Sequence, residues 1–166
     1  SVQIGVDAIL AAKVPHTFLS VDGYGRVSVI KSTGNPDGHL ILRGGVRGPN
    51  YTAEHVADAV ERLKKADVPP YLMIDCSHGN SGKDHRNQPL VFRNVMEQRL
   101  GGNRHIVALM LESHLFEGSQ KLGASPSSLK YGVSITDACI GWEETEALMM
   151  EAYGSLKRQQ AVPAHA

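Results

Sequence analysis

The sequence contains few cysteines, few aromatic residues and no excess of charge of either sign. Its 166 residues include only Cys76 and Cys139, too few for the disulfide framework of a small secreted domain. Lys plus Arg and Asp plus Glu each number 17, so no net basic charge attracts nucleic acid or an acidic membrane. The apolar runs are far shorter than the roughly 18 residues that cross a bilayer, and no signal-peptide pattern opens the chain. We therefore expect a cytoplasmic protein without a nucleic-acid or membrane partner.

What the sequence does contain is the composition of a folded domain. Hydrophobic residues make up 42% and charged residues 20%, which is an ordinary globular balance. The length of 166 residues corresponds to about one domain. The chain begins at Ser1 rather than Met, and residues 1–13 already have apolar side chains at close to helical spacing. We expect residues 1–166 to form a single partial domain taken from a longer polypeptide.

Strands and helices are expected to alternate along the chain. The pattern predicts strands at 16–21, 26–30, 39–42, 71–76 and 105–112, and helices at 1–13, 53–66, 89–100 and 143–159. The turn sequence DGYG joins the first two strands into an exposed hairpin, an insertion of about residues 18–34. We expect Thr52 to cap the second helix, Gly101 and Gly102 to end the third, and residues 160–166 to form a frayed tail.

Apolar strands separated by helices predict an α/β fold with a parallel sheet. The candidate architectures are a doubly wound sheet and a (β/α)8 TIM barrel. No glycine-rich phosphate fingerprint follows a strand, which weakens the doubly wound alternative. Three successive strands instead end in Arg43, in Asp75 with His78, and in Glu112, and the carboxyl ends of barrel strands meet at one mouth. Because only about four parallel strands are present and a barrel needs eight, we expect half a barrel.

His78, Glu112 and Asp137 are the leading candidates for a metal site. Each lies just beyond an apolar strand or in the loop that follows one. One imidazole and two carboxylates form a mixed nitrogen and oxygen donor set that is compatible with Mn²⁺, Fe²⁺, Co²⁺ or Zn²⁺. The alternative is that all three residues cap loops or lie at the surface.

Arg43 stands in the sequence LRGG, where the glycines allow a backbone or a ligand to approach closely. Its guanidinium suits a bidentate grip on phosphate or carboxylate, and the alternative is a salt bridge at the rim. Residues 118–132 read equally as a lid or as a plain loop. Lys83 and His114 are weaker candidates, which we expect to be solvated in polar loops. We expect Cys76 and Cys139 to be packed small residues. Surface or capping positions are expected for His39, His55 and His85.

Four segments of the sequence occur together in a recognisable order. They are HLILRGG followed by PNY (39–51), MIDCSHGNSGK (73–83), LESHLFEGSQ (111–120) and GVSITDACIGWEET (132–145). The chain closely resembles the C-terminal half of class I 3-deoxy-D-arabino-heptulosonate-7-phosphate (DAHP) synthases, and within them the feedback-regulated subgroup. The resemblance runs from near residue 2 to about residue 157.

The resemblance implies a function and a set of roles. Enzymes of this family condense phosphoenolpyruvate with erythrose 4-phosphate and release phosphate, the first step of the shikimate pathway of aromatic amino acid biosynthesis. The family's metal ligands fall on His78, Glu112 and Asp137, and its phosphoenolpyruvate-binding arginine falls on Arg43. His78 and Asp137 also lie close to substrate in the family, and His78 and Arg43 are the implied catalytic pair. The hairpin resembles an allosteric element for an aromatic amino acid, with Phe18, Ser20 and Ile30 at its contact positions.

The resemblance also implies what the chain lacks. The family's fourth metal ligand, a cysteine, lies in an earlier strand, together with the basic residues that hold the substrate phosphates. We therefore expect the chain to need a missing N-terminal half, to expose two strand edges, to be inactive alone and to act within a homo-oligomer. Two alternatives stay open: a non-catalytic, self-associating half-barrel module, and a related enolpyruvate-condensing synthase that acts on another sugar phosphate.

Overall fold

The structure is a computed structural model that describes residues 1–123 and 125–161, and it confirms the α/β class. Along the chain lie α1 (Val2–Lys13), β1 (Thr17–Val21), β2 (Val27–Lys31), β3 (Leu40–Leu42), α2 (Ala53–Lys65), β4 (Leu72–Asp75), η1 (His85–Asn87), α3 (Gln88–Leu100), β5 (Ile106–Met110), η2 (Pro126–Ser128) and α4 (Trp142–Ala161), with η denoting a 3-10 helix. Each predicted helix and strand is present, with ends a few residues from those expected.

Three strands form a parallel sheet in the order β3-β4-β5. The sequence predicted about four parallel strands. In the described residues the place of a fourth is taken by a single parallel bridge between Ser113 and Ile140. The pairing stops there because the next residue back, Cys139, pairs antiparallel with Gly118 inside the long loop.

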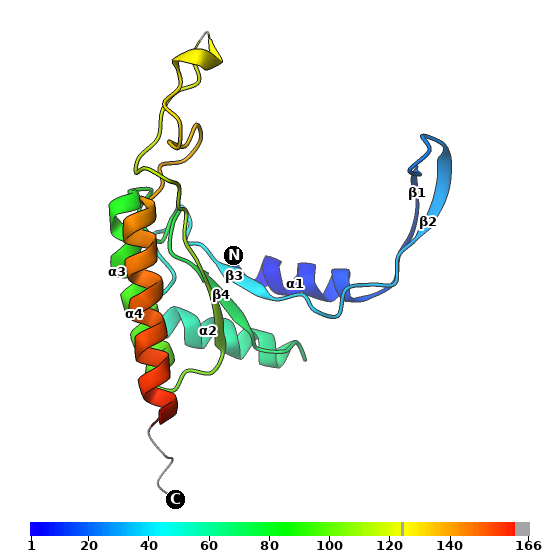
Figure 1. The fold of residues 1–166 in the computed structure, drawn as a ribbon. Coiled ribbons are helices and arrows are strands. Elements are labelled where there is room, and N and C mark those ends of the chain that lie inside the picture. Colours follow the sequence, from blue (N-terminus) through cyan, green and yellow to red (C-terminus); the bar gives the residue numbers. More distant parts are fainter. Residues whose placement is uncertain (124, 162–166) are drawn as a thin grey trace, which may run out of the picture.

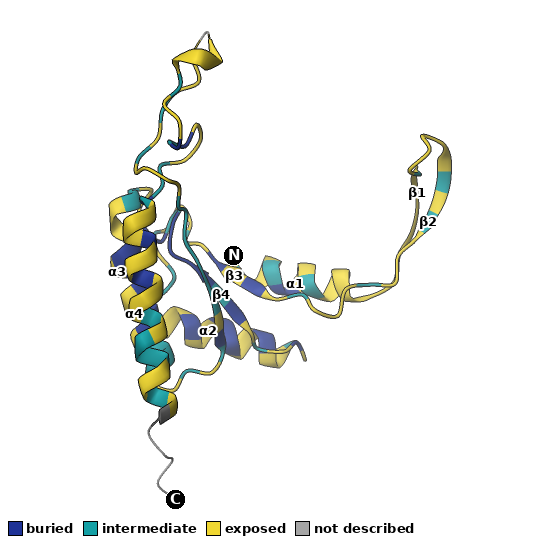
Figure 2. Ribbon diagram, viewed as in Figure 1, coloured by how far each residue is buried: buried dark blue, intermediate teal, exposed yellow. Residues whose placement is uncertain are grey.

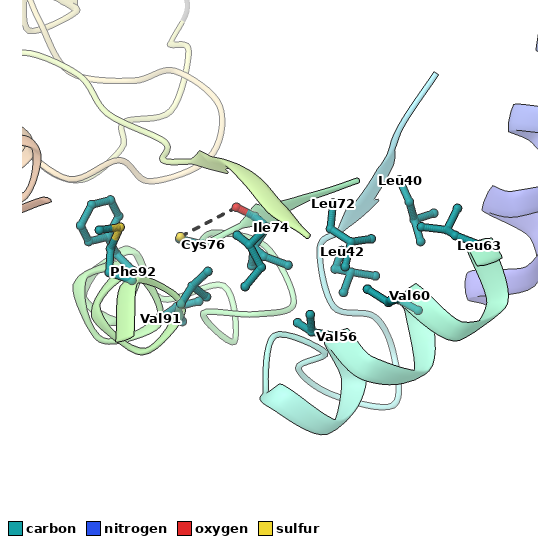
Figure 3. Packing of buried hydrophobic residues seen from close by; sticks show 14 of the residues in the cluster. Leu40, Leu42, Val56, Val60, Leu63, Leu72, Ile74, Cys76, Val91 and Phe92 are labelled. Atoms are coloured by element: carbon teal, nitrogen blue, oxygen red, sulfur yellow. Dashed lines mark hydrogen bonds between the residues drawn. The ribbon is translucent and has the colours of Figure 1, made fainter. Parts of the chain in front are cut away.

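The hydrophobic core lies on one face of this sheet (Figure 3). Val56, Val60 and Leu63 recur at helical spacing on α2 and pack with Leu42 of β3 and Ile74 of β4. Full burial of each such side chain contributes about 1.5–3 kcal/mol before the entropic cost of folding. α3 extends the same core with a set of buried apolar residues: Val91, Phe92, Val95 and Met96.

The opposite face of the sheet is less covered in the part of the chain that is described (Figure 2). Ile41 and Met73 are paired on this face, and Ile41 is 42% exposed. A doubly wound sheet carries helices on both faces. With α2 and α3 on the same face, the arrangement does not match that alternative.

α4 lies beside α3 (Figure 1). Its inward stripe was predicted and is buried or partly buried: Leu148, Ala152 and Leu156. Near its end, the side-chain amide of Gln159 donates to the carbonyl of Leu100 at 2.7 Å. Because α4 continues through Ala161, the expected tail from residue 160 is corrected, and residues 162–166 lie outside the described residues. Within residues 1–123 and 125–161 no helix is both long enough and apolar enough to span a membrane.

The expected helix ends are present with one change of detail. α2 begins after Thr52, but the Thr52 hydroxyl bonds to His55 Nδ1 at 2.7 Å instead of capping a backbone N–H. Thr52 is thus the N-cap residue of α2, as expected, but without a side-chain hydrogen bond to the helix backbone. α3 ends at Gly101, and the backbone reverses at Gly102, whose φ of 102° favours glycine.

β1 and β2 form a separate antiparallel hairpin that projects away from the parallel sheet (Figure 1). Phe18 is paired with Ile30 and Ser20 with Ser28, so these four side chains share one face. Leu19, on the other face, is 74% exposed. A two-stranded hairpin alone is marginally stable in water.

The turn of the hairpin is held by Asp22. Its carboxylate accepts hydrogen bonds from the backbone N–H groups of Arg26 and Tyr24 and from the Arg26 guanidinium. These donors, led by the Arg26 backbone, hold the pKa of Asp22 below its ordinary value. The hairpin therefore keeps its register by local polar contacts rather than by a core of its own.

Candidate metal centre

The carboxyl ends of β3, β4 and β5 converge on one pocket. Its volume is about 170 Å³, below the roughly 300–1,000 Å³ of pockets for drug-sized ligands. A space of this size suits an ion and a small anion better than a nucleotide. The pocket is lined by Arg43, Ser77, His78, Lys83, His85, Glu112, Asp137 and Ala138. The structure thus brings together the four residues that the sequence singled out on separate strand ends and loops.

His78, Glu112 and Asp137 present one donor atom each to the same space. His78 Nε2 lies 3.7 Å from Glu112 Oε1 and 3.9 Å from Asp137 Oδ2, and the three donor atoms all lie within 4.8 Å of one another. Metal–ligand bonds of about 2.1 Å place neighbouring donors roughly 3–4 Å apart. The spacing and the chemistry of the set fit a divalent ion, with Asp137 the most exposed member at 73%.

The imidazole of His78 is held in place by Asp75, the last residue of β4. Asp75 Oδ2 lies 2.7 Å from His78 Nδ1. With Nδ1–H donating to this carboxylate, the lone pair of Nε2 faces Glu112 and Asp137. His78 itself has a φ of 46°, a left-handed conformation that non-glycine residues adopt at a cost. The Lys83 N–H donates to the His78 carbonyl at 2.7 Å and helps to keep this turn closed.

Glu112 is fixed by two neighbours. The hydroxyl of Ser77 donates to Glu112 Oε2, which leaves Oε1 toward His78. The fully buried side chain of Gln88, in the first turn of α3, bonds the backbone of Glu112 at both its N–H and its C=O. The position of Glu112 therefore depends on contacts from the loop after β4 and from α3.

The loop that carries Arg43 is interlocked with the loop that carries His78. A Cβ on Gly44 would lie 2.4 Å from the backbone of Gly79, and the φ of Gly44 is 72°. The close approach that the LRGG sequence predicted is thus an approach of backbone to backbone. The polar bonds between the loops run through two asparagines: Asn50 accepts from Gly44 N–H, and Asn80 accepts from Asn50 N–H and donates to the Leu42 and Asp75 carbonyls.

Neither cysteine belongs to the donor group. Burial raises the pKa of the Cys76 thiol to about 12, with a further rise from the nearby Asp75 carboxylate, and Cys76 is packed in the core as expected. Burial also raises the pKa of Cys139, which is only partly buried and so differs from that expectation. Both thiols are protonated at neutral pH.

The weaker candidates separate once the loops are in place. Lys83 lines the pocket, whereas His114 is exposed and accepts a hydrogen bond from the Leu115 N–H. His85 was expected at the surface, and this is corrected: its side chain is only 17% exposed and lines the pocket. η1 turns His85 inward between Asp84 and Glu117, and a single sequence carries no signal for that turn.

Sequence reasoning gave no role to the residues that support the donors. Asp75, Ser77 and Asn80 were noted as polar residues at the end of a buried strand, without a supporting role, and Gln88 was not singled out. The available signal was the run of polar residues directly after a buried strand, since buried polar side chains need partners.

The three predicted effector contacts lie in the hairpin, which projects away from the parallel sheet (Figure 1). Phe18, Ser20 and Ile30 share one hairpin face, as their pairing requires. Phe18 is 49% exposed, so this face has an apolar side chain free for a ligand or another chain.

Comparison with known proteins agrees with the resemblance. The DAHP synthetase I family matches residues 1–150. The chain is 46% identical over 159 residues to the Tyr-sensitive phospho-2-dehydro-3-deoxyheptonate aldolase of Escherichia coli (strain K12), covering 96% of the chain and 44% of that protein. It is 47% identical to the Phe-sensitive protein of the same strain, covering 96% of the chain and 45% of that protein. The structure of the aldolase from Francisella tularensis SCHU S4 superposes with a TM-score of 0.90 at 42% identity, covering 96% of this chain and 46% of that one. The chain thus spans less than half the length of these relatives.

Proposed function

The chain belongs to the DAHP synthetase I family, and we propose that it forms the metal-binding C-terminal part of an enzyme that condenses phosphoenolpyruvate with erythrose 4-phosphate to DAHP and phosphate. The products would enter aromatic amino acid biosynthesis in the cytoplasm. The observation that carries the proposal is the meeting of Arg43 with the donor group His78, Glu112 and Asp137 in one pocket.

We further propose that residues 1–166 are a single C-terminal half-barrel with the hairpin as an insertion. The helices on one sheet face, the parallel order β3-β4-β5 and the pocket at the strand ends support this architecture. The half-covered face with Ile41 would then be the barrel interior, closed by an N-terminal half.

The donor group suits Mn²⁺, Fe²⁺, Co²⁺ or Zn²⁺, since it mixes one imidazole with two carboxylates. A divalent ion held by His78, Glu112 and Asp137 supplies a Lewis acid for the aldehyde oxygen of erythrose 4-phosphate. Cys76 and Cys139 are not part of this group in the described residues. The resemblance implies a fourth ligand, a cysteine in an earlier strand of the complete polypeptide.

The chain's own side chains then have separate tasks. Arg43 binds the negative charge of phosphoenolpyruvate and fixes its orientation, because a guanidinium grips carboxylate or phosphate in a bidentate manner. Lys83 adds positive charge to the same wall. The interlocked glycine loops hold Arg43 beside His78, so that substrate and metal donors keep one geometry.

The proposal is tested by phosphate release from phosphoenolpyruvate in the presence of erythrose 4-phosphate and Mn²⁺. We expect activity in the polypeptide that the native gene encodes and none in residues 1–166 alone. Arg43→Gln should lower the activity by roughly a hundredfold or more, whereas Arg104→Gln, at an exposed position outside the pocket, should leave it unchanged. No DAHP from the complete polypeptide, or full activity in Arg43→Gln, would contradict the proposal.

We propose that the hairpin binds an aromatic amino acid through Phe18, Ser20 and Ile30 and inhibits the enzyme. The shared face of these residues and the half-exposed ring of Phe18 support it. Relatives named Tyr-sensitive and Phe-sensitive are similar to the chain at 46% and 47% identity, so both amino acids are candidates. Because the chain resembles the feedback-regulated subgroup of the family, we also propose that the complete polypeptide forms a homo-oligomer.

A second candidate function is a non-catalytic half-barrel that associates with itself. The partly exposed sheet face and the apolar groove between β5, α3 and α4 favour it. Size-exclusion chromatography together with a Mn²⁺ titration separates the two: a monomer that binds the metal tightly counts against the module, and an oligomer that binds none supports it. A related synthase for another sugar phosphate would be recognised by its preference among aldehyde substrates in the same phosphate assay.

A further inference from the structure

We propose that Asp75 is the positioning residue of the metal site, fixing both His78 and, through Ser77, Glu112. This inference rests on the proposed function for the identity of the ligand, a divalent cation. Asp75 is not itself one of the three donors. Its role is to decide which nitrogen of His78 faces the cation and where the carboxylate of Glu112 stands.

Both oxygens of Asp75 are engaged by the loop that carries the ligand. Oδ1 accepts the Ser77 N–H at 2.8 Å, and Oδ2 lies 2.7 Å from His78 Nδ1. Asp75 is only 2% exposed, and a buried carboxylate is stable only when such partners surround it. Since β4 ends at Asp75, the sheet itself serves as the rigid base of this arrangement.

The contact to His78 has a chemical consequence. An imidazole that donates from Nδ1 to a carboxylate has its other nitrogen free as an acceptor, and such carboxylate–histidine pairs orient metal ligands and raise their basicity. His78 Nε2 is the atom that faces Glu112 and Asp137. The left-handed φ of 46° at His78 makes the contact more important, because an unsupported side chain there would favour relaxation of the backbone.

Through its contact to Ser77, Asp75 also helps to position the second donor, Glu112. With its N–H on Asp75, Ser77 turns its hydroxyl to Glu112 Oε2. Two donors are therefore set by one carboxylate, whereas Asp137 is 73% exposed and stands outside this network. The site combines two prearranged ligands with one that is free to adjust.

The test uses Asp75→Asn in the full chain, with Asp58→Asn as the matched control. Asp58 is an exposed carboxylate on α2 that is paired with Arg62 and is not among the residues that line the pocket. A single amide oxygen cannot replace both carboxylate oxygens, so either the Ser77 N–H or the His78 Nδ1–H loses its acceptor. We expect Mn²⁺ affinity, measured by titration with detection of free Mn²⁺ by electron paramagnetic resonance, to fall about 10–100-fold. Asp58→Asn should keep the wild-type affinity.

A second readout needs no metal. Long-range ¹⁵N–¹H correlation spectra at alkaline pH report the tautomer of His78 in the metal-free chain. We expect Nδ1–H in the wild type and a loss of that preference in Asp75→Asn. Ser77→Ala should keep the tautomer, because its backbone N–H remains, yet weaken Mn²⁺ binding.

The outcomes separate this inference from the proposed function. An Nε2–H tautomer in the wild type overturns the positioning role even if Asp75→Asn fails to fold. Unchanged Mn²⁺ affinity in a folded Asp75→Asn variant, checked by thermal melting, also overturns it. If the wild type shows the Nδ1–H tautomer but binds no Mn²⁺, the metal function fails while the orientation of His78 by Asp75 is supported.

Discussion

Gln88 grips the backbone of Glu112 with both ends of its side-chain amide. Its Nε2 donates to the Glu112 carbonyl at 3.1 Å, and its Oε1 accepts the Glu112 N–H at 2.8 Å. The side chain is fully buried. A residue at the start of α3 thereby satisfies the backbone N–H and C=O of a candidate metal donor that follows β5.

Removing this clamp should cost stability. Gln88→Ala leaves two buried backbone groups of Glu112 without their partners, so we expect the free energy of unfolding to fall by about 1–3 kcal/mol. Chemical denaturation followed by circular dichroism measures it. Gln3→Ala, at an exposed position on α1, is the control and should change little. Equal stability of Gln88→Ala and the wild type would show that the clamp is not needed.

The interlock of the two site loops makes a prediction about neighbouring glycines. An alanine at position 44 would need a left-handed φ, at a cost of about 1–2 kcal/mol, and its Cβ would overlap the Gly79 backbone at 2.4 Å. Gly44→Ala should therefore lower the denaturation midpoint clearly. Gly45→Ala should be tolerated, because its Cβ would meet nothing within 4 Å. A similar loss in both variants would contradict the interlock.

The two thiols should differ in reactivity and in pH dependence. Burial raises the pKa of Cys76 to about 12 from the ordinary 9.0. A raised folded-state pKa means that the unfolded chain ionises first, so the stabilisation is complete below pH 9 and is lost as the pH rises toward 12, by at most about 1.4 kcal/mol per pH unit. Denaturation between these pH values should show this slope in the wild type and a smaller one in Cys76→Ala.

Labelling gives an independent check on the same pair. Cys139 is partly exposed, so at about pH 8 a thiol reagent should modify it well before Cys76, because reactivity follows thiolate content and access. Mass spectrometry of the labelled peptides measures the order. Faster labelling of Cys76 would contradict the burial described for β4.

The hairpin predicts an effector response that is confined to one face. If the proposed effector site is right, Phe18→Ala should abolish inhibition by tyrosine or phenylalanine in the complete polypeptide. Its uninhibited rate should stay unchanged, because the hairpin projects away from the parallel sheet (Figure 1). Leu19→Ala removes an apolar side chain from the opposite face and is the control. The test is to measure inhibition curves for both amino acids in each variant. Loss of inhibition only in Leu19→Ala would contradict an effector site on the Phe18 face of the hairpin.

Much of the architecture could be predicted because apolar periodicity reports burial directly. The segments around Ile74 and Val56 have the spacing of a buried strand and an amphipathic helix, and the structure has both. The polar residues after the strands predicted where Arg43, His78 and Glu112 would meet, because parallel strands end at one edge.

Other features depend on contacts between distant residues. The inward turn of His85 follows from η1, and the hydrogen bond between Gln88 and the Glu112 backbone joins residues 24 positions apart. No local sequence pattern predicts either feature. The sequence predicted about four parallel strands without placing one after residue 112. In the described residues the pairing beyond β5 is limited to the bridge between Ser113 and Ile140, since Cys139 pairs with Gly118.

The most direct test of the account is the binding of Mn²⁺ to the chain, alone and within the complete polypeptide that the native gene encodes. We predict one site, with affinity reduced at least about tenfold in His78→Gln and Glu112→Gln and unchanged in Glu146→Gln, an exposed position on α4. Binding that is absent from the complete protein, or that survives intact in Glu112→Gln, would contradict the metal centre at the ends of β4 and β5.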